Sequence, residues 1–394
     1  MPLEEECRSL DAADPLAAVV AQFAPGEPGV LYFDANSIGA MPLGAERAMA
    51  RLGDQWRRLR RRGWTDADWL EAPARLGGKL APVVGAEPGS VIVCDSTSVN
   101  LHKLVWMGLE MNSGRNVVLS EKGTFPTDLY VAENAARARG ASLRLVASPE
   151  EIEKSLKDDV ALLLLSHTDY RSAYRHDLAT LTRMAHDRGV LVLWDLSHSA
   201  GAVETALASG QADFAVGCGY KYLCGGLGAP AWLYVAPRHQ AAAQPAIAGW
   251  MGHAEPMAFD ASYRAAPGVK RHLAGTPPVS GNALMEAALD LWADIEPRAA
   301  FEKHARLGDL LIRTVQELTP QSGLQLASPR EAARRGGFVA FRHARAAQLA
   351  DSLNAVGVVV SHRKPDILRF GLSPLYHRYL DVWELGVRLK GRTT

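Results

Sequence analysis

The chain has 394 residues, of which 48% are hydrophobic and 22% are charged, as is ordinary for a globular protein. Its 43 basic and 43 acidic side chains balance, so it lacks the charge excess typical of nucleic-acid and membrane-surface proteins. The acidic start MPLEEECRSL is unlike a secretory signal, and no apolar run approaches the roughly 18 residues of a membrane span. The four cysteines have no metal-binding spacing, so we expect no metal site and a reducing, cytoplasmic compartment.

Residues 1–50 are expected to form an N-terminal segment and arm. A helix and a Pro/Gly-rich connection lead to LYFDANS at 31–37, which is typical of a short strand running into a turn. Asn36 and Ser37 either lie beside a ligand there or only close the turn with side-chain hydrogen bonds. The pattern from residue 45 to about 84 is helical.

From residue 87 onward, strands and helices alternate with short loops, which predicts a largely parallel sheet. The strand at 91–94 is followed by three hydroxyl side chains and a helix. A helix start favours anions, so Thr97 and Ser98 are candidates for binding a phosphate. Simple capping of the helix is the alternative and needs only one hydroxyl.

The next two strands, at 116–120 and 160–165, also end in polar or aromatic residues. Phe125 precedes a helix that begins near Asp128. An aromatic ring at the exit of a strand either lies on a planar cofactor or packs in the core.

An apolar strand at 190–194 ends in Asp195, and His198 follows three residues later. A strand without polar alternation is typical of a parallel sheet buried on both faces. In open α/β sheets the carboxyl ends of the strands face the ligand crevice. Asp195 is therefore placed either to bind a ligand or to cap the next helix.

Lys221 lies between two tyrosines, in the small-residue sequence GCGYKYLCGG. Lysines are normally solvated, and one among small and aromatic residues is suited to be the neutral amine that forms a Schiff base. A solvated cap is the alternative. Pyridoxal phosphate requires both such a lysine and a carboxylate for its pyridine nitrogen. The combination of Lys221 with Asp195 is thus more specific than either residue alone.

After residue 235 the alternation weakens, and residues 338–370 are expected to form strand, helix, strand and strand. Arg369 lies on the last of these strands, where it either clamps a substrate carboxylate or makes a surface ion pair. We predict an α/β fold with a large, mostly parallel domain over 51–280 and a smaller α+β domain over 281–394.

The motifs STSVNLHK, FPTDLY, WDLSHSAGAVE, GCGYKYLCGG, GWMGH and GTPP resemble those of kynureninases. These are class V-like enzymes with the fold of aspartate aminotransferase, fold type I, and they use pyridoxal 5'-phosphate. The resemblance runs from about residue 33 to 376. It implies that Lys221 carries the cofactor and that Arg369 binds the substrate carboxylate. It also implies that the cofactor contacts are Thr97, Ser98, Phe125, Asp128, Ser166, Asp195, His198 and Tyr220, with Trp250 and Thr276 from the partner of a homodimer.

The implied reaction is hydrolysis of L-kynurenine to anthranilate and L-alanine, with Lys221, Tyr220 and Asp195 as the catalytic residues. Animal relatives, which favour 3-hydroxykynurenine, carry Asn at the position of Thr276 and a His near residue 63, so we expect plain kynurenine as substrate. An aminotransferase or a cysteine desulfurase of the same fold remains an alternative, although no cysteine follows Cys224. A cofactor-binding protein without catalysis is a further alternative.

Overall fold

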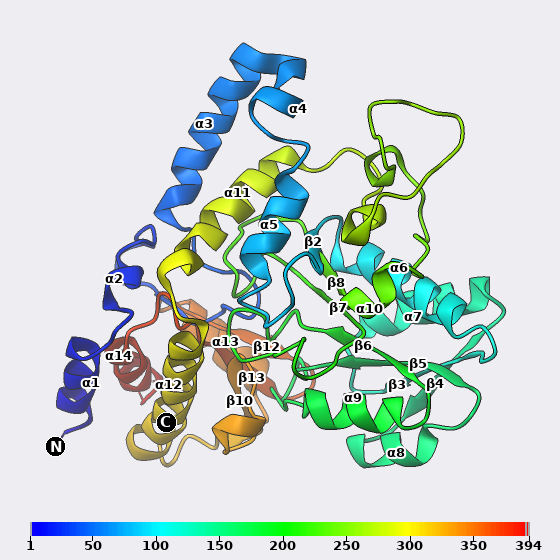
Figure 1. Ribbon diagram of the computed structural model, residues 1–394. Coiled ribbons are helices and arrows are strands. Elements are labelled where there is room, and N and C mark those ends of the chain that lie inside the picture. The colour runs from blue at the N-terminus through cyan, green and yellow to red at the C-terminus, as the bar shows by residue number, and fades with distance from the viewer. Residues whose placement is uncertain (1, 391, 393–394) are drawn as a thin grey trace.

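A seven-stranded sheet forms the centre of the computed structural model, which describes residues 2–390 and 392 (Figure 1). Its strand order is β2-β8-β7-β6-β5-β3-β4. The strands are β2 (Val91–Val93), β3 (Val117–Glu121), β4 (Ser142–Val146), β5 (Val160–Ser166), β6 (Leu191–Asp195), β7 (Phe214–Gly217) and β8 (Trp232–Val235). Strands β4, β3, β5, β6 and β7 are parallel, whereas β8 runs antiparallel to both β7 and β2.

Helices cover both faces of this sheet because its central strands are apolar on both sides. All seven residues of β5 are buried, and neighbouring residues enter different cores: Leu163 packs in one and Leu164 in the other. The helices of this part are α5 (Ala72–Leu80), α6 (Thr97–Met111), α7 (Pro126–Ala138), α8 (Ile152–Ser155), α9 (Leu178–His186) and α10 (Pro237–Gln240), with 3-10 turns η2 (Pro149–Glu151), η3 (Trp250–Gly252) and η4 (Gly268–His272).

A smaller antiparallel sheet, of order β12-β13-β10-β9, lies toward the C-terminus. Its strands are β9 (Gln325–Leu326), β10 (Phe338–Arg342), β12 (Ser361–Arg363) and β13 (Ile367–Gly371), and a parallel pair joins β1 (Leu31–Tyr32) to β11 (Val358–Val359). The helices around it are α12 (Pro297–Leu318), α13 (Ala346–Asn354) and α14 (Tyr379–Lys390), with η6 (Ala332–Arg334). Helix α11 (Val279–Leu289) and η5 (Asp290–Asp294) instead pack against α5 and join the core of the large sheet.

The N-terminal segment packs on this C-terminal part. The carboxylate of Asp11, in α1 (Leu3–Ala12), accepts hydrogen bonds from the backbone N–H groups of Tyr379 and Leu380 at the start of α14 (2.7 and 3.0 Å). Figure 1 shows α1 beside α14. Leu31 and Phe33 belong to the same apolar core as α12 and α14. A short helix, α2 (Ala17–Val20), lies between α1 and β1 in the chain. The division into 1–50, 51–280 and 281–394 stays a proposal.

The helical stretch from residue 45 to 84 is interrupted, in contrast to its continuous pattern in the sequence. Helix α3 (Leu43–Leu59) ends where Arg60 adopts a φ of 48°, and η1 (Arg60–Arg62) and α4 (Gly63–Asp66) follow before α5. Gly63 is required at this break, because a Cβ there would lie 2.2 Å from the ring of Trp69. In Figure 1, α3 and α4 extend away from the body of the molecule. None of the helices in the described part is long and apolar enough to cross a membrane.

Candidate active site

The carboxyl ends of the parallel strands bring several of the predicted residues to one edge of the large sheet. Ser166 and Asp195 end neighbouring strands and are direct cross-strand partners. Residue 216 of β7 pairs with Asp195, and the lysine loop (residues 218–228) begins just after that strand. Ligands of open α/β sheets bind at this edge, so the topology places the candidate carboxylate and the candidate amine around one crevice.

Lys221 contacts a buried histidine. Its Nζ lies 3.1 Å from Nε2 of His198, which is 6% exposed. Burial and the charge of Lys221 lower the pKa of His198 well below its ordinary value, so the imidazole is neutral and Nε2 accepts from the amine. His198 Nδ1 then carries the proton, and this buried atom has no hydrogen-bond partner among the described residues.

Two carboxyl groups adjoin the lysine. Asp195 Oδ1 accepts from the backbone N–H and the hydroxyl of Ser197 (2.9 and 2.6 Å), which fixes its orientation. Asp128 lies in the first turn of α7 and is 2% exposed. Burial and the charge of Asp195 raise the pKa of Asp128 well above its ordinary value, while Lys221 opposes the shift. These surroundings favour the protonated form of Asp128, and its Oδ2 atom has no partner in the described chain.

The residues expected to contact the phosphate and the ring lie at the starts of α6 and α7. Thr97 and Ser98 form the first turn of α6, and Ser96 caps that helix by accepting from the backbone of residue 99 (3.3 Å). The Thr97 and Ser98 side chains are thus not needed for the cap. Phe125 is 38% exposed and meets Tyr170 edge-on, with the ring centroids 5.3 Å apart.

Tyr220 precedes the lysine and is 37% exposed. The neighbouring Cys218, together with burial, raises the pKa of Tyr220 above its ordinary value. The phenol is therefore protonated at neutral pH and able to donate a proton or a hydrogen bond.

The N-terminal arm covers the lysine loop. The backbone N–H of Gly39 donates to the carbonyl of Tyr220 (2.8 Å), and a Cβ at Gly39 would lie 2.2 Å from the carbonyl oxygen of Lys221. Asn36 is 1% exposed, and neither its amide nitrogen nor its oxygen has a partner among the described residues. A buried amide without partners is costly unless a polar ligand satisfies it. Ser37, beside it, is half-buried.

Arg369 reaches the site from the small sheet. Its guanidinium is fully buried, and it donates to the carbonyl of Tyr170 (2.8 Å) and twice to Ser361 Oγ (2.9 and 3.3 Å). It also lies 5.4 Å from the ring of Phe338, which in turn meets the ring of His198 at 5.7 Å. Burial lowers the pKa of Arg369 to about 10, and no described carboxylate lies within 4 Å of it. The surface ion pair that the sequence left open is therefore absent from the described chain.

Trp250 and Thr276 make their described contacts with residues other than the lysine. Trp250 contacts Trp64 and Phe259, both with ring centroids 6.4 Å away, and Thr276 is exposed. The two segments adjoin each other, since the N–H of Met251 donates to the carbonyl of residue 274 (3.2 Å). No hydrogen bond or ring contact within the described residues joins either one to Lys221.

Sequence reasoning missed three residues of this region: Tyr170, Ser361 and Arg363. Tyr170 stands in the polar loop after β5, and the other two share β12 with no local motif around them. Tyr170 reaches Arg369 through the packing of the two sheets, whereas Ser361 and Arg363 lie near it because β12 pairs with β13. For these two, the short spacing to Arg369 in the sequence was the one signal.

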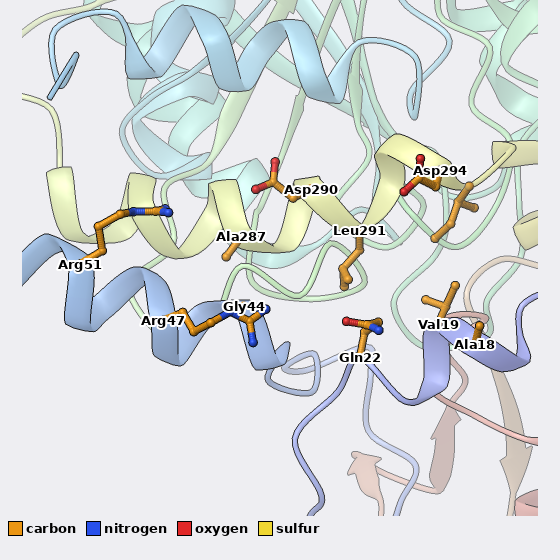
Figure 2. A pocket seen from close by; sticks show the side chains of 11 residues that line it. Ala18, Val19, Gln22, Gly44, Arg47, Arg51, Ala287, Asp290, Leu291 and Asp294 are labelled. Atoms are coloured by element: carbon orange, nitrogen blue, oxygen red, sulfur yellow. The ribbon is translucent and has the colours of Figure 1, made fainter.

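A cleft of about 600 Å³ lies elsewhere, between α2, α3, α11 and η5. Figure 2 shows Arg47 and Arg51 of α3 on one side and Asp290 and Asp294 of η5 on the other. None of the predicted site residues lines it. The buried unpartnered atoms of Asp128 and His198 lie instead at the sheet edge described above.

Comparisons with known proteins agree on one family. Residues 301–389 match the family described as "Kynureninase C-terminal domain". The curated kynureninase of Pseudomonas fluorescens is 39% identical over 98% of this chain and 94% of its own length, and that of Deinococcus radiodurans is 44% identical over 95% and 92%.

Solved structures agree on the fold. The cystine C-S lyase C-DES in complex with cysteine persulfide has a TM-score of 0.80 at 17% identity, covering 93% of this chain and 99% of that one. Apo cysteine desulfurase from Thermococcus onnurineus NA1 has a TM-score of 0.79 at 19% identity, covering 95% and 97%. The chain thus has the α/β fold of the fold-type-I pyridoxal-phosphate enzymes, and it belongs to the kynureninase family.

Proposed function

We propose that this protein hydrolyses L-kynurenine to anthranilate and L-alanine with pyridoxal 5'-phosphate as cofactor. One observation carries the proposal. A lysine amine, a neutral imidazole and two carboxyls gather at the sheet edge, linked through Phe338 to a buried guanidinium without a counterion. Similarity to curated kynureninases along nearly the whole chain supports it.

The residues present fit the cofactor. The unpartnered polar atoms of Asp128 and His198 are buried beside Lys221 and need a polar ligand. Asp195 would hold the pyridine nitrogen protonated, and the α6 N-terminus with Thr97 and Ser98 would hold the phosphate. Asp128, Ser166, His198 and Tyr220 are the further contacts we propose, with Phe125 against the ring.

The cofactor, when bound, withdraws electrons from the amino-acid α-carbon, so that the proton there becomes acidic. Lys221 removes that proton, and the neutral His198 next to it accepts a hydrogen bond from the lysine amine. Arg369 holds the substrate carboxylate, and its burial excludes the water that would weaken this contact. Asn36 and Ser37 bind polar groups of the substrate from the arm.

Hydrolysis then adds water across the bond between the β- and γ-carbons. The γ-carbon gains the oxygen and becomes the carboxylate of anthranilate, while the β-carbon gains a proton and becomes the methyl group of alanine. Tyr220, whose phenol stays protonated, is the group we assign to proton transfer at the ketone oxygen.

Anthranilate fluorescence tests the function directly. Purified protein with cofactor should release anthranilate from kynurenine and turn over 3-hydroxykynurenine less efficiently, because the sequence favours the plain substrate. Lys221→Ala should lose both turnover and the visible absorbance of the bound cofactor. Amino-group exchange with pyruvate and no anthranilate would instead favour an aminotransferase.

We also propose a homodimer in which Trp250 and Thr276 reach the partner's cofactor. Support comes from the lack of a hydrogen bond or ring contact between them and Lys221 in the described chain, and from the large exposed side chains of Trp56, Leu227 and Phe259. Sedimentation should give a dimer, and Trp250→Ala should weaken cofactor binding. Four unpaired cysteines support a cytoplasmic location.

A further inference from the structure

A second arginine shares the face of the small sheet that carries Arg369. In the antiparallel pair β12–β13, Ser361 lies directly opposite Arg369. Arg363 is two residues beyond Ser361, and side chains alternate along a strand, so all three project from one face. This face meets the large domain at His198 and Tyr170.

Arg363 has no carboxylate partner. The only hydrogen bond found for its guanidinium in the described chain runs from Nη1 to the backbone carbonyl of His362 (2.8 Å), and no acidic oxygen of that part lies within 4 Å. Burial lowers the pKa of Arg363 below its ordinary value, and its charge in turn lowers the pKa values of Arg369 and His198. Arg363 is therefore close enough to both Arg369 and His198 for its charge to change their pKa values.

The nearest carboxylate is already engaged. Asp34 Oδ1 accepts a hydrogen bond from Ser361 Oγ (2.6 Å), and the same hydroxyl oxygen accepts from Arg369. The aspartate is thereby held on the serine rather than on either guanidinium. Two cations face the site without an anion between them, an arrangement that an anionic ligand stabilises.

We propose that Arg363 is a second guanidinium for the substrate α-carboxylate and determines the preference for the free amino acid over its ester or amide. The inference rests on the proposed function. A carboxylate has about four acceptor positions, enough for donors from two arginines. Arg369, fully buried and fixed by three hydrogen bonds, is the anchor, whereas the half-buried Arg363 has most of its N–H groups free.

The test compares acid and ester substrates. Arg363→Gln should raise KM for L-kynurenine about tenfold and leave kcat within about twofold, because it removes one charge-assisted hydrogen bond made in both ground and transition states. The kcat/KM for L-kynurenine methyl ester should not change. Arg363→Lys, which keeps the charge, should lower kcat/KM for L-kynurenine about threefold. Arg342→Gln, on the same sheet but exposed and paired with Asp366, is the matched control and should behave as wild type.

If Arg363→Gln lowered kcat/KM equally for L-kynurenine and its methyl ester, or lowered kcat at constant KM, the assignment would be overturned. A second readout does not depend on kynurenine turnover. Titration of the holoenzyme with L-alanine, followed by cofactor absorbance, should show weaker binding in Arg363→Gln than in wild type, with L-alaninamide binding unchanged. A wild-type protein that bound alanine but released no anthranilate would contradict the proposed function alone. Unchanged alanine binding in the variant would contradict the role of Arg363 alone.

Discussion

Replacing Arg369 by methionine should abolish most activity at little cost in stability. Methionine keeps a long side chain but removes the charge that we assign to the substrate carboxylate. Truncating one partner of a buried, hydrogen-bonded charge pair costs about 2–5 kcal/mol, so kcat/KM for kynurenine should fall at least about thirtyfold.

The effect of Arg369→Met on the free energy of unfolding follows from the burial and hydrogen bonds of Arg369. Burial lowers the pKa of Arg369 from 12.5 to about 10, which corresponds to a penalty of about 3 kcal/mol for keeping the charged form in the folded protein. Methionine removes this penalty and loses three hydrogen bonds, each contributing about 1 kcal/mol. The two changes nearly cancel, so the free energy of unfolding should stay within about 1 kcal/mol of wild type.

Anthranilate fluorescence and urea unfolding measure the two quantities, with Arg342→Met as an exposed control on the same sheet. A stability loss above about 3 kcal/mol with kcat/KM falling less than fivefold would show that Arg369 is structural and refute the reasoning.

Three further predictions concern the site carboxyls, the packing of the lysine loop and an ion-pair cluster on α11. Asp128→Asn should keep kcat within about tenfold, because burial and the charge of Asp195 favour the protonated, uncharged form of its carboxyl. Asp195→Asn should lower kcat on the order of a hundredfold, and equal losses in a kynurenine assay would contradict this. Gly39→Ala places a methyl group 2.2 Å from a backbone oxygen of the lysine loop and should lower the free energy of unfolding by about 1–3 kcal/mol. Gly26→Ala, which has open space around it, is the control and should change this free energy little. Urea titrations that show no difference between the two variants would argue against the close packing. Burial opposes ionisation of Glu286, but hydrogen bonds from the arginine and lysine of α5 lower its pKa to about 2, below about 4.3 in the unfolded chain. The stabilisation that ionised Glu286 gives should be complete above about pH 5 and should disappear as pH falls toward 2. The difference in the free energy of unfolding between wild type and Glu286→Gln, measured with urea, should therefore vanish in acid.

The strands of the large sheet were predictable because they are buried, apolar and local. The apolar runs at 116–120, 160–165 and 190–194 match β3, β5 and β6 within a few residues. The strand order was not predictable. β8 inserts antiparallel between β2 and β7, which depends on long-range packing that no local pattern encodes. The break after Arg60 likewise depends on how Trp69 packs against Gly63.

The residues of the candidate site were likewise predictable only in part. Asp195 and Lys221 could be found from sequence because each follows a recognisable strand, and parallel strands end at one edge. The contact of Lys221 with His198 follows from the same geometry. The roles of Tyr170, Ser361 and Arg363 could not be found. Tyr170 reaches Arg369 only through packing of the small sheet on the large one, and no motif marks Ser361 and Arg363 on β12. The assignment of roles to all these residues stays a prediction until variants are measured.

The most direct test traps the cofactor on the amine that holds it. Holoenzyme is reduced with borohydride, digested and mapped by mass spectrometry. The account predicts a pyridoxyl label on the peptide that contains Lys221, and loss of that label in Lys221→Ala. A label on any other lysine, or none on a protein that still releases anthranilate, would contradict it.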